Sequence, residues 1–317
     1  MDKLFQHEIV FFGGKGGVGK STSASAFALA AADEGQKTLL VSTDPAHNLG
    51  DLFDKTIGDN ATSLSANLWG VEISSEEETR RYINGVKDNL KGLVKSHMAE
   101  EVNRQIDMAA VSPGAEEAAL FDRVVKIVLE EKKEYDLIVF DTAPTGHTVR
   151  LLSLPELMEA WIEGMLQRRQ AVNENYSQWL HDGEPVADPI YQTLMERKDR
   201  FSKARHTLMD KKKTGYVYVL TPEKLPIAET GRALQLLDHT ELKVTTLIVN
   251  KCMPEEAGIS HFFVQRRKQE EVYRKNIEER FPDRRKLYLP LQEEDISSRT
   301  TLETMKENLI QALKSNT

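Results

Sequence analysis

The sequence contains one cysteine among 317 residues, which excludes an intramolecular disulfide and a zinc site made of several thiolates from one chain. No apolar run approaches the ~18 residues of a membrane span, and the N-terminal segment MDKLFQHE lacks the apolar core of a signal peptide. Basic residues are not in excess either, because the chain has 42 Lys and Arg against 50 Asp and Glu. We therefore expect a cytoplasmic protein that does not bind nucleic acid.

Apolar residues make up 40% of the chain, enough for a sizeable core. Several short apolar runs are continuous rather than alternating, which is typical of parallel strands covered on both faces. The alanine-rich segment 21–34 follows the first run and a glycine-rich loop, and it has the composition of a buried helix. The predicted strands are residues 8–12, 37–42, 135–140, 215–220 and 244–249.

Two long helix-patterned stretches interrupt this series, at about 75–133 and 151–213. Both are too long for simple crossover connections between neighbouring parallel strands. We therefore expect residues 1–317 to form a single α/β domain. Its sheet is predicted to be doubly wound and mostly parallel, with a helical subdomain inserted in two pieces.

Residues 14–21 read GKGGVGKS, which fits the phosphate-loop pattern G-x-x-x-x-G-K-[ST] between a predicted strand and a predicted helix. The glycines let backbone N–H groups surround an anionic phosphate at the helix N-terminus. Lys20 is expected to bridge the terminal phosphates and Ser21 to help hold Mg²⁺. The predicted nucleotide-binding residues are Gly14, Lys15, Gly16, Gly17, Val18, Gly19, Lys20, Ser21 and Thr22.

Two acids, Asp44 and Asp141, follow predicted strands, at the sheet edge where such folds bind ligands. An aspartate there can orient or deprotonate the attacking water, or hold a water of the Mg²⁺ shell. Taken alone, each acid is equally compatible with a helix cap or a turn.

The loop with its second lysine, Lys15, resembles the deviant phosphate loop of a group of dimeric ATPases. With the strings DPAHNL at 44–49 and DTAPTGHT at 141–148, nearly the whole chain resembles the arsenite-pump ATPase (ArsA) and the ATPases that target tail-anchored membrane proteins. The resemblance implies MgATP hydrolysis, with Asp44 activating water and Asp141 on the magnesium side, acting through water. It also implies a homodimer in which Lys15 reaches the partner's nucleotide; the alternative is a solvated loop lysine.

The same resemblance makes Asn250 the contact to the adenine amine. Glu223 and Pro290 are further candidates for the base pocket, with a plain strand-end turn as an equal alternative for both. His47 and His147 invite a metal interpretation, but each belongs to a string already explained as a switch loop. Targeting members often share zinc through a Cys-x-x-Cys pair, and the matching stretch 262–271 has no cysteine, so no zinc is expected.

The expected function is that of a transport-energising ATPase of the arsenite-pump type, docked at the membrane through an efflux protein. The alternative is a chaperone ATPase that delivers tail-anchored clients. Four methionines in the insertion could line a client groove or belong to an ordinary core, and charged residues interrupt its apolar surface. A partitioning ATPase is disfavoured because the C-terminal helix carries acids among its lysines. The methionines are Met158, Met165, Met195 and Met209.

Overall fold

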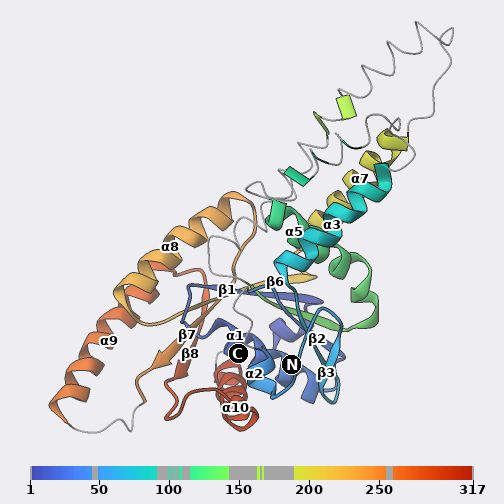
Figure 1. The fold of residues 1–317 in the computed structure, drawn as a ribbon. Helices are drawn as coiled ribbons and strands as arrows, with labels where there is room; N and C mark the ends of the chain where they lie inside the picture. Colours follow the sequence, from blue (N-terminus) through green and yellow to red (C-terminus); the bar gives the residue numbers. More distant parts are fainter. Residues whose placement is uncertain are drawn as a thin grey trace, which may run out of the picture. The chain divides into compact units, whose positions relative to one another are not determined.

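The structure, a computed structural model, describes residues 2–44, 49–90, 115–142, 189–254 and 260–315, and isolated positions between them (100, 104, 107, 108, 163, 164, 166 and 167). The chain divides into two compact units. Figure 1 shows the fold with colours that follow the residue number. The sheet unit comprises Met1–Ser74, Lys132–Val149 and Met209–Thr317. The helical unit comprises Ser75–Glu131 and Arg150–Leu208, close to the two stretches expected to form the insertion.

The sheet unit is built on an eight-stranded sheet, in the order β3-β4-β2-β5-β1-β6-β7-β8. All neighbouring strands are parallel except β3 and β4. The mostly parallel, doubly wound α/β fold predicted from the sequence is confirmed. The strands are β1 Ile9–Gly14, β2 Thr38–Ser42, β3 Thr62–Ser65, β4 Leu68–Glu72, β5 Leu137–Asp141, β6 Thr214–Leu220, β7 Thr246–Cys252 and β8 Arg285–Pro290.

Three of these strands were not predicted, and all three lie toward an edge of the sheet. Strand β8 begins with Arg285 and Lys286, and only Leu287 and Leu289 in it are buried, so it has no long buried apolar run. Strands β3 and β4 are short and partly exposed. The edge strands β3 and β8 bury few residues, as edge strands can, which is why the search for apolar runs missed them; β4 was missed although Leu68, Gly70 and Val71 in it are buried.

One hydrophobic core lies on the face of the sheet where α1, α2 and α10 gather (Figure 1). Helix α1 is buried around nearly its whole circumference, as its alanine-rich composition predicts. The C-terminal helix packs its four buried apolar residues, Leu302, Met305, Leu309 and Leu313, into this core. In the described part of this unit the helices are η1 Lys3–Gln6, α1 Lys20–Asp33, α2 Leu49–Phe53, α8 Lys224–His239, α9 His261–Arg280 and α10 Arg299–Ser315. The short helix η2 Glu131–Glu134 begins one residue before the unit's second segment, which starts at Lys132.

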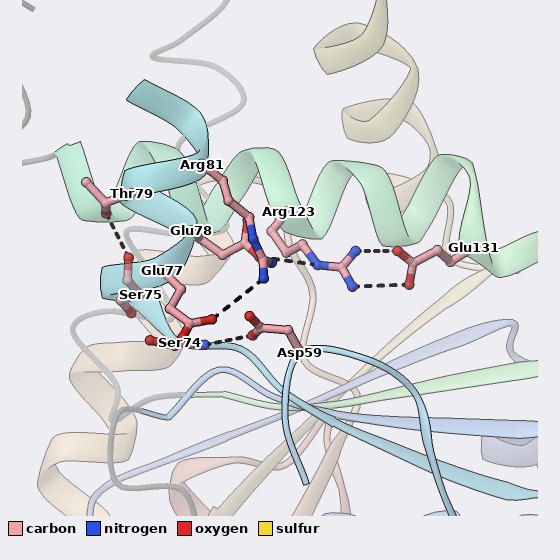
Figure 2. A network of polar contacts seen from close by, with 9 residues as sticks. All are labelled: Asp59, Ser74, Ser75, Glu77, Glu78, Thr79, Arg81, Arg123 and Glu131. Atoms are coloured by element: carbon pink, nitrogen blue, oxygen red, sulfur yellow. Dashed lines mark hydrogen bonds and ion pairs between the residues drawn. The ribbon is translucent and has the colours of Figure 1, made fainter. Parts of the chain in front are cut away.

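The helical unit contains α3 Ser75–Leu90, α5 Ala115–Leu129 and most of α7 Pro189–Met209. The rings of Phe121 and Phe201 join α5 to α7, with centroids 5.2 Å apart. Figure 2 shows that Arg123 of α5 points between two acids, pairing with buried Glu78 of α3 at 3.7 Å and with Glu131. Because both acids compensate one nearly buried guanidinium, this network links the start of α3 to the end of α5. No helix in the described part of the chain is long and apolar enough to cross a membrane.

Candidate functional site

The predicted phosphate loop connects β1, which lies between β5 and β6, to the start of α1. Gly17 and Gly19 have φ angles of 80° and 89°, in the left-handed region that glycine adopts without steric cost. Helix α1 begins at Lys20 without a side-chain cap. The N–H groups of its first turn are thereby available to an anion, as a phosphate site requires.

Gly19 is also required by a close approach of the end of β7. A Cβ atom at this position would lie 2.3 Å from Nδ2 of Asn250, far inside van der Waals contact. That amide, buried to 4% exposure, donates to the carbonyl of Val18 at 2.9 Å. Asn250 therefore holds the loop directly, a contact that was not predicted from the sequence. Its expected contact with adenine stays a prediction.

Lys20 lies between the two strand-end acids. Its Nζ is 3.3 Å from Oδ2 of Asp44 and 3.9 Å from Oδ1 of Asp141, and the lysine is only 5% exposed. Strand β5 pairs with both β1 and β2, so the parallel topology brings these strand ends to one edge. The structure thus gathers the three charged groups that the sequence assigns to phosphate and water.

Asp141 is the most strongly perturbed acid of this group. Burial raises its pKa from the ordinary 3.8 to about 6, against the opposing effects of the Lys20 charge and a hydrogen bond with Ser21. Its Oδ1 is buried and has no hydrogen-bond partner among the described residues. An oxygen in that condition requires a partner, and a water of a Mg²⁺ shell would provide one.

The residues present fit a magnesium nucleotide. Ser21 and Asp141 supply hard oxygen donors of the kind that Mg²⁺ prefers. Among the residues described, no group of three or more His, Cys, Asp or Glu side chains is placed to hold a metal ion. Mg²⁺ commonly uses one or two protein oxygens and takes its other ligands from nucleotide phosphates and water, and this donor set matches that pattern.

Lys15 does not extend freely into solvent. Its Nζ lies 3.0 Å from both carboxylate oxygens of Glu229 on α8, and the two side chains are 44% and 33% exposed. Sequence reasoning missed Glu229, because nothing local marks it as a partner of a residue 214 positions away. The cation that resemblance assigns to a partner subunit's nucleotide is paired here within its own chain.

Three candidates for a base pocket lie at or just after the ends of adjacent strands β6, β7 and β8. Glu223 is an exposed residue preceding α8, Asn250 lies in β7, and Pro290 ends β8. The structure thus places them along one edge of the sheet. Thr22, also expected at the nucleotide, donates its hydroxyl to the carbonyl of Gly19 at 2.9 Å.

Several expectations lie outside the described residues. These include residues 45–48 and 143–150, which complete the two switch segments and contain His47 and His147, and the methionines Met158 and Met165. Met195 is described and 40% exposed. The single cysteine, Cys252, is buried in β7, and burial raises the pKa of its thiol to about 12.

The chain is similar to known proteins over nearly its whole length. The family model described as anion-transporting ATPase matches residues 7–311. A protein of Aquifex aeolicus provisionally named arsenical pump-driving ATPase 2 is 38% identical over 91% of this chain and 94% of its own length. "ATPase ASNA1 homolog 1" of Paramecium tetraurelia is 32% identical over 90% of this chain and 87% of its own length. "ATPase GET3" of Phaeosphaeria nodorum is 30% identical over 93% of this chain and 92% of its own length.

Proposed function

The chain belongs to the anion-transporting ATPase family and is an ATP-hydrolysing enzyme, and we propose that it works as a magnesium-dependent homodimer that energises membrane transport, most closely in the manner of an arsenite-efflux pump-driving ATPase. The observation that best supports an ATP site is the position of Lys20 beside two strand-end acids at the phosphate loop. We place the protein in the cytoplasm, attached to the membrane through its transporter.

In the proposed mechanism the loop N–H groups and Lys20 bind the terminal phosphates. The Lys20 ammonium, now compensated by Asp44 and Asp141, would then compensate phosphate charge that grows in the transition state. Ser21 and Asp141 would hold Mg²⁺, the second through water, and the bound ion would supply further charge neutralisation. With the lysine engaged on phosphate, the Asp44 carboxylate would orient the attacking water and accept its proton.

The homodimer proposal rests on Lys15. Its partly exposed ammonium, 44% accessible in the side chain, can exchange one carboxylate partner for a phosphate at little desolvation cost. In the dimer, Lys15 of each subunit would leave Glu229 and bind the nucleotide of the other. This would supply the charge that an arginine finger provides in other phosphoryl-transfer enzymes.

The choice of an efflux pump over a client chaperone depends on the helical unit. Its helix α7 places Arg197, Lys198 and Arg200 near its centre, whereas a groove for a bare apolar helix needs a broad apolar surface. The alternative, a chaperone that binds and targets tail-anchored proteins, is favoured by the exposure of Met108 and Met195, at 66% and 40%. Relatives carry names of both kinds.

One experiment distinguishes these partners. ATP hydrolysis by the purified protein would be measured with and without the efflux protein in vesicles, and in parallel with a tail-anchored protein in place of it. The proposal expects faster hydrolysis with the efflux protein and no stable complex with the client. A stable, ATP-dependent client complex without any response to the efflux protein would reverse the assignment.

A further inference from the structure

The end of β7 contains an irregularity beside the phosphate loop. The register of β7 against β8 shifts between Val249 and Cys252, so that β7 holds one more residue than its neighbour. Within this bulge Lys251 has a φ angle of 58°, a left-handed conformation that is sterically costly for a lysine. Bulges commonly re-aim side chains beside functional sites, and backbone strain of this kind persists only where the surrounding structure maintains it.

The bulge directs two consecutive side chains onto two consecutive carbonyls of the loop. Asn250 Nδ2 donates to the carbonyl of Val18, and Lys251 Nζ donates to the carbonyl of Gly17, both at 2.9 Å. Asn250 is buried and Lys251 is exposed. The loop is therefore anchored from outside by one neutral amide and one ammonium, although 234 positions separate Lys251 from Gly17.

These two contacts determine where the loop's donors point. In a planar trans peptide the N–H is directed opposite to the C=O. The Gly17 carbonyl belongs to the same peptide as the N–H of Val18, and the Val18 carbonyl to the same peptide as the N–H of Gly19. With both carbonyls held toward β7, both N–H groups are directed away from it, as donors to an anion must be.

The charge on Lys251 adds a second effect. A hydrogen bond from a cation is stronger than one from a neutral donor, and hydrogen bonds in series polarise one another. The ammonium on the Gly17 carbonyl therefore makes the Val18 N–H a better donor. It does so without occupying the phosphate site.

We propose that Lys251 is a positioning residue of the phosphate loop, which orients and polarises the Gly17–Val18 peptide so that its N–H binds a nucleotide phosphate. The left-handed backbone at Lys251 is then the conformational cost of placing this ammonium on the loop. The inference concerns the ATP site itself and does not depend on whether a transporter or a client is the partner.

The test measures MgADP and MgATP affinity by calorimetry in Lys251→Met, which keeps the aliphatic stem and removes the donor. Affinity for both nucleotides should fall by a similar factor of about two to ten, the range for one hydrogen bond. KM for ATP should rise by that factor while kcat changes little, because Lys251 does not touch the reacting atoms. The matched control is Lys55→Met, since Lys55 is also an exposed lysine that donates to a backbone carbonyl, that of Ser63; its affinities should equal those of the wild type.

A second variant, Lys251→Gly, separates positioning from simple stabilisation. Glycine adopts a φ of this sign freely, so this variant should unfold at a higher temperature than Lys251→Met while binding ADP just as weakly. Wild-type ADP affinity in both variants would overturn the proposal. So would a loss confined to ATP, which would indicate direct contact with the γ-phosphate, or a loss of affinity that follows the loss of thermal stability across the two variants.

Discussion

Replacing Glu229 by glutamine tests how Lys15 is controlled. In the structure both carboxylate oxygens of Glu229 lie 3.0 Å from the Lys15 ammonium. On the homodimer proposed above, each lysine must leave this acid before it reaches the partner's nucleotide. The ion pair therefore opposes dimerisation, and Glu229→Gln should strengthen the ATP-bound dimer, because glutamine keeps the size of the side chain and removes its charge.

The size of the effect follows from the exposure of the pair. With side chains 44% and 33% accessible, solvent screens the attraction, and exposed ion pairs contribute about 0.2–1 kcal/mol. A symmetric dimer releases two such pairs, which gives about 0.4–2 kcal/mol in total. The dimer dissociation constant should therefore fall by about two- to thirtyfold.

Sedimentation velocity with a non-hydrolysable ATP analogue measures that constant. Lys15→Met should act in the opposite direction and weaken the dimer, although it removes the other half of the same ion pair. The double variant should behave like Lys15→Met. Asp199→Asn, which removes an exposed pair with Lys203 on α7, is the matched control and should change nothing.

The opposite signs expected of the two single variants make the reasoning refutable. If Glu229→Gln and Lys15→Met both weaken the dimer, the pair is a stabilising contact of the dimeric state rather than one that must open. If the protein remains monomeric with ATP at every concentration and is fully active, the cross-subunit role of Lys15 is wrong.

Lys20→Ala should abolish MgATP binding, whereas Asp44→Asn should bind MgATP and lose turnover, since only the first removes the charge that compensates phosphate. Calorimetry measures binding by each variant, and a phosphate-release assay measures turnover. Near-normal turnover in Asp44→Asn would reassign the catalytic acid. Asp141→Asn should raise the free energy of unfolding of the magnesium-free protein at about pH 8 by about 2–3 kcal/mol, because burial raises the pKa of Asp141 from 3.8 to about 6. That gain should shrink as the pH falls through 6 and vanish below 3.8, where the carboxyl is protonated before and after unfolding; urea titrations with equal gains at about pH 8 and below 3.8 would contradict it. Cys252→Ser should leave ATP hydrolysis nearly unchanged, and arsenite should stimulate hydrolysis by the wild type little. Strong metalloid binding needs about three soft ligands, and this single thiol is buried in β7. A large Cys252-dependent activation by arsenite would contradict this prediction.

Much of the site could be predicted from the sequence because its parts are local. The spacing of glycines and lysine in residues 14–21 specifies a loop whose backbone must turn around an anion. Asp44 and Asp141 could be placed because the strands before them are continuous apolar runs, and parallel strands end at one edge of a sheet. The same reasoning missed β3 and β8, which are exposed in part and lack long apolar runs, and β4, whose apolar stretch 68–71 is short.

The sequence by itself predicted the fold class, the phosphate loop and the position of Asp44 and Asp141 at strand ends, because each follows from short-range periodicity, turn chemistry or motif spacing. Only the tertiary structure decided which side chains hold that loop and its second lysine. Glu229 reaches Lys15 across 214 positions, and Lys251 reaches Gly17 across 234. Such contacts depend on the relative placement of α8, the β7 bulge and the loop, and no periodicity along the chain encodes the distance between surface groups so far apart in sequence.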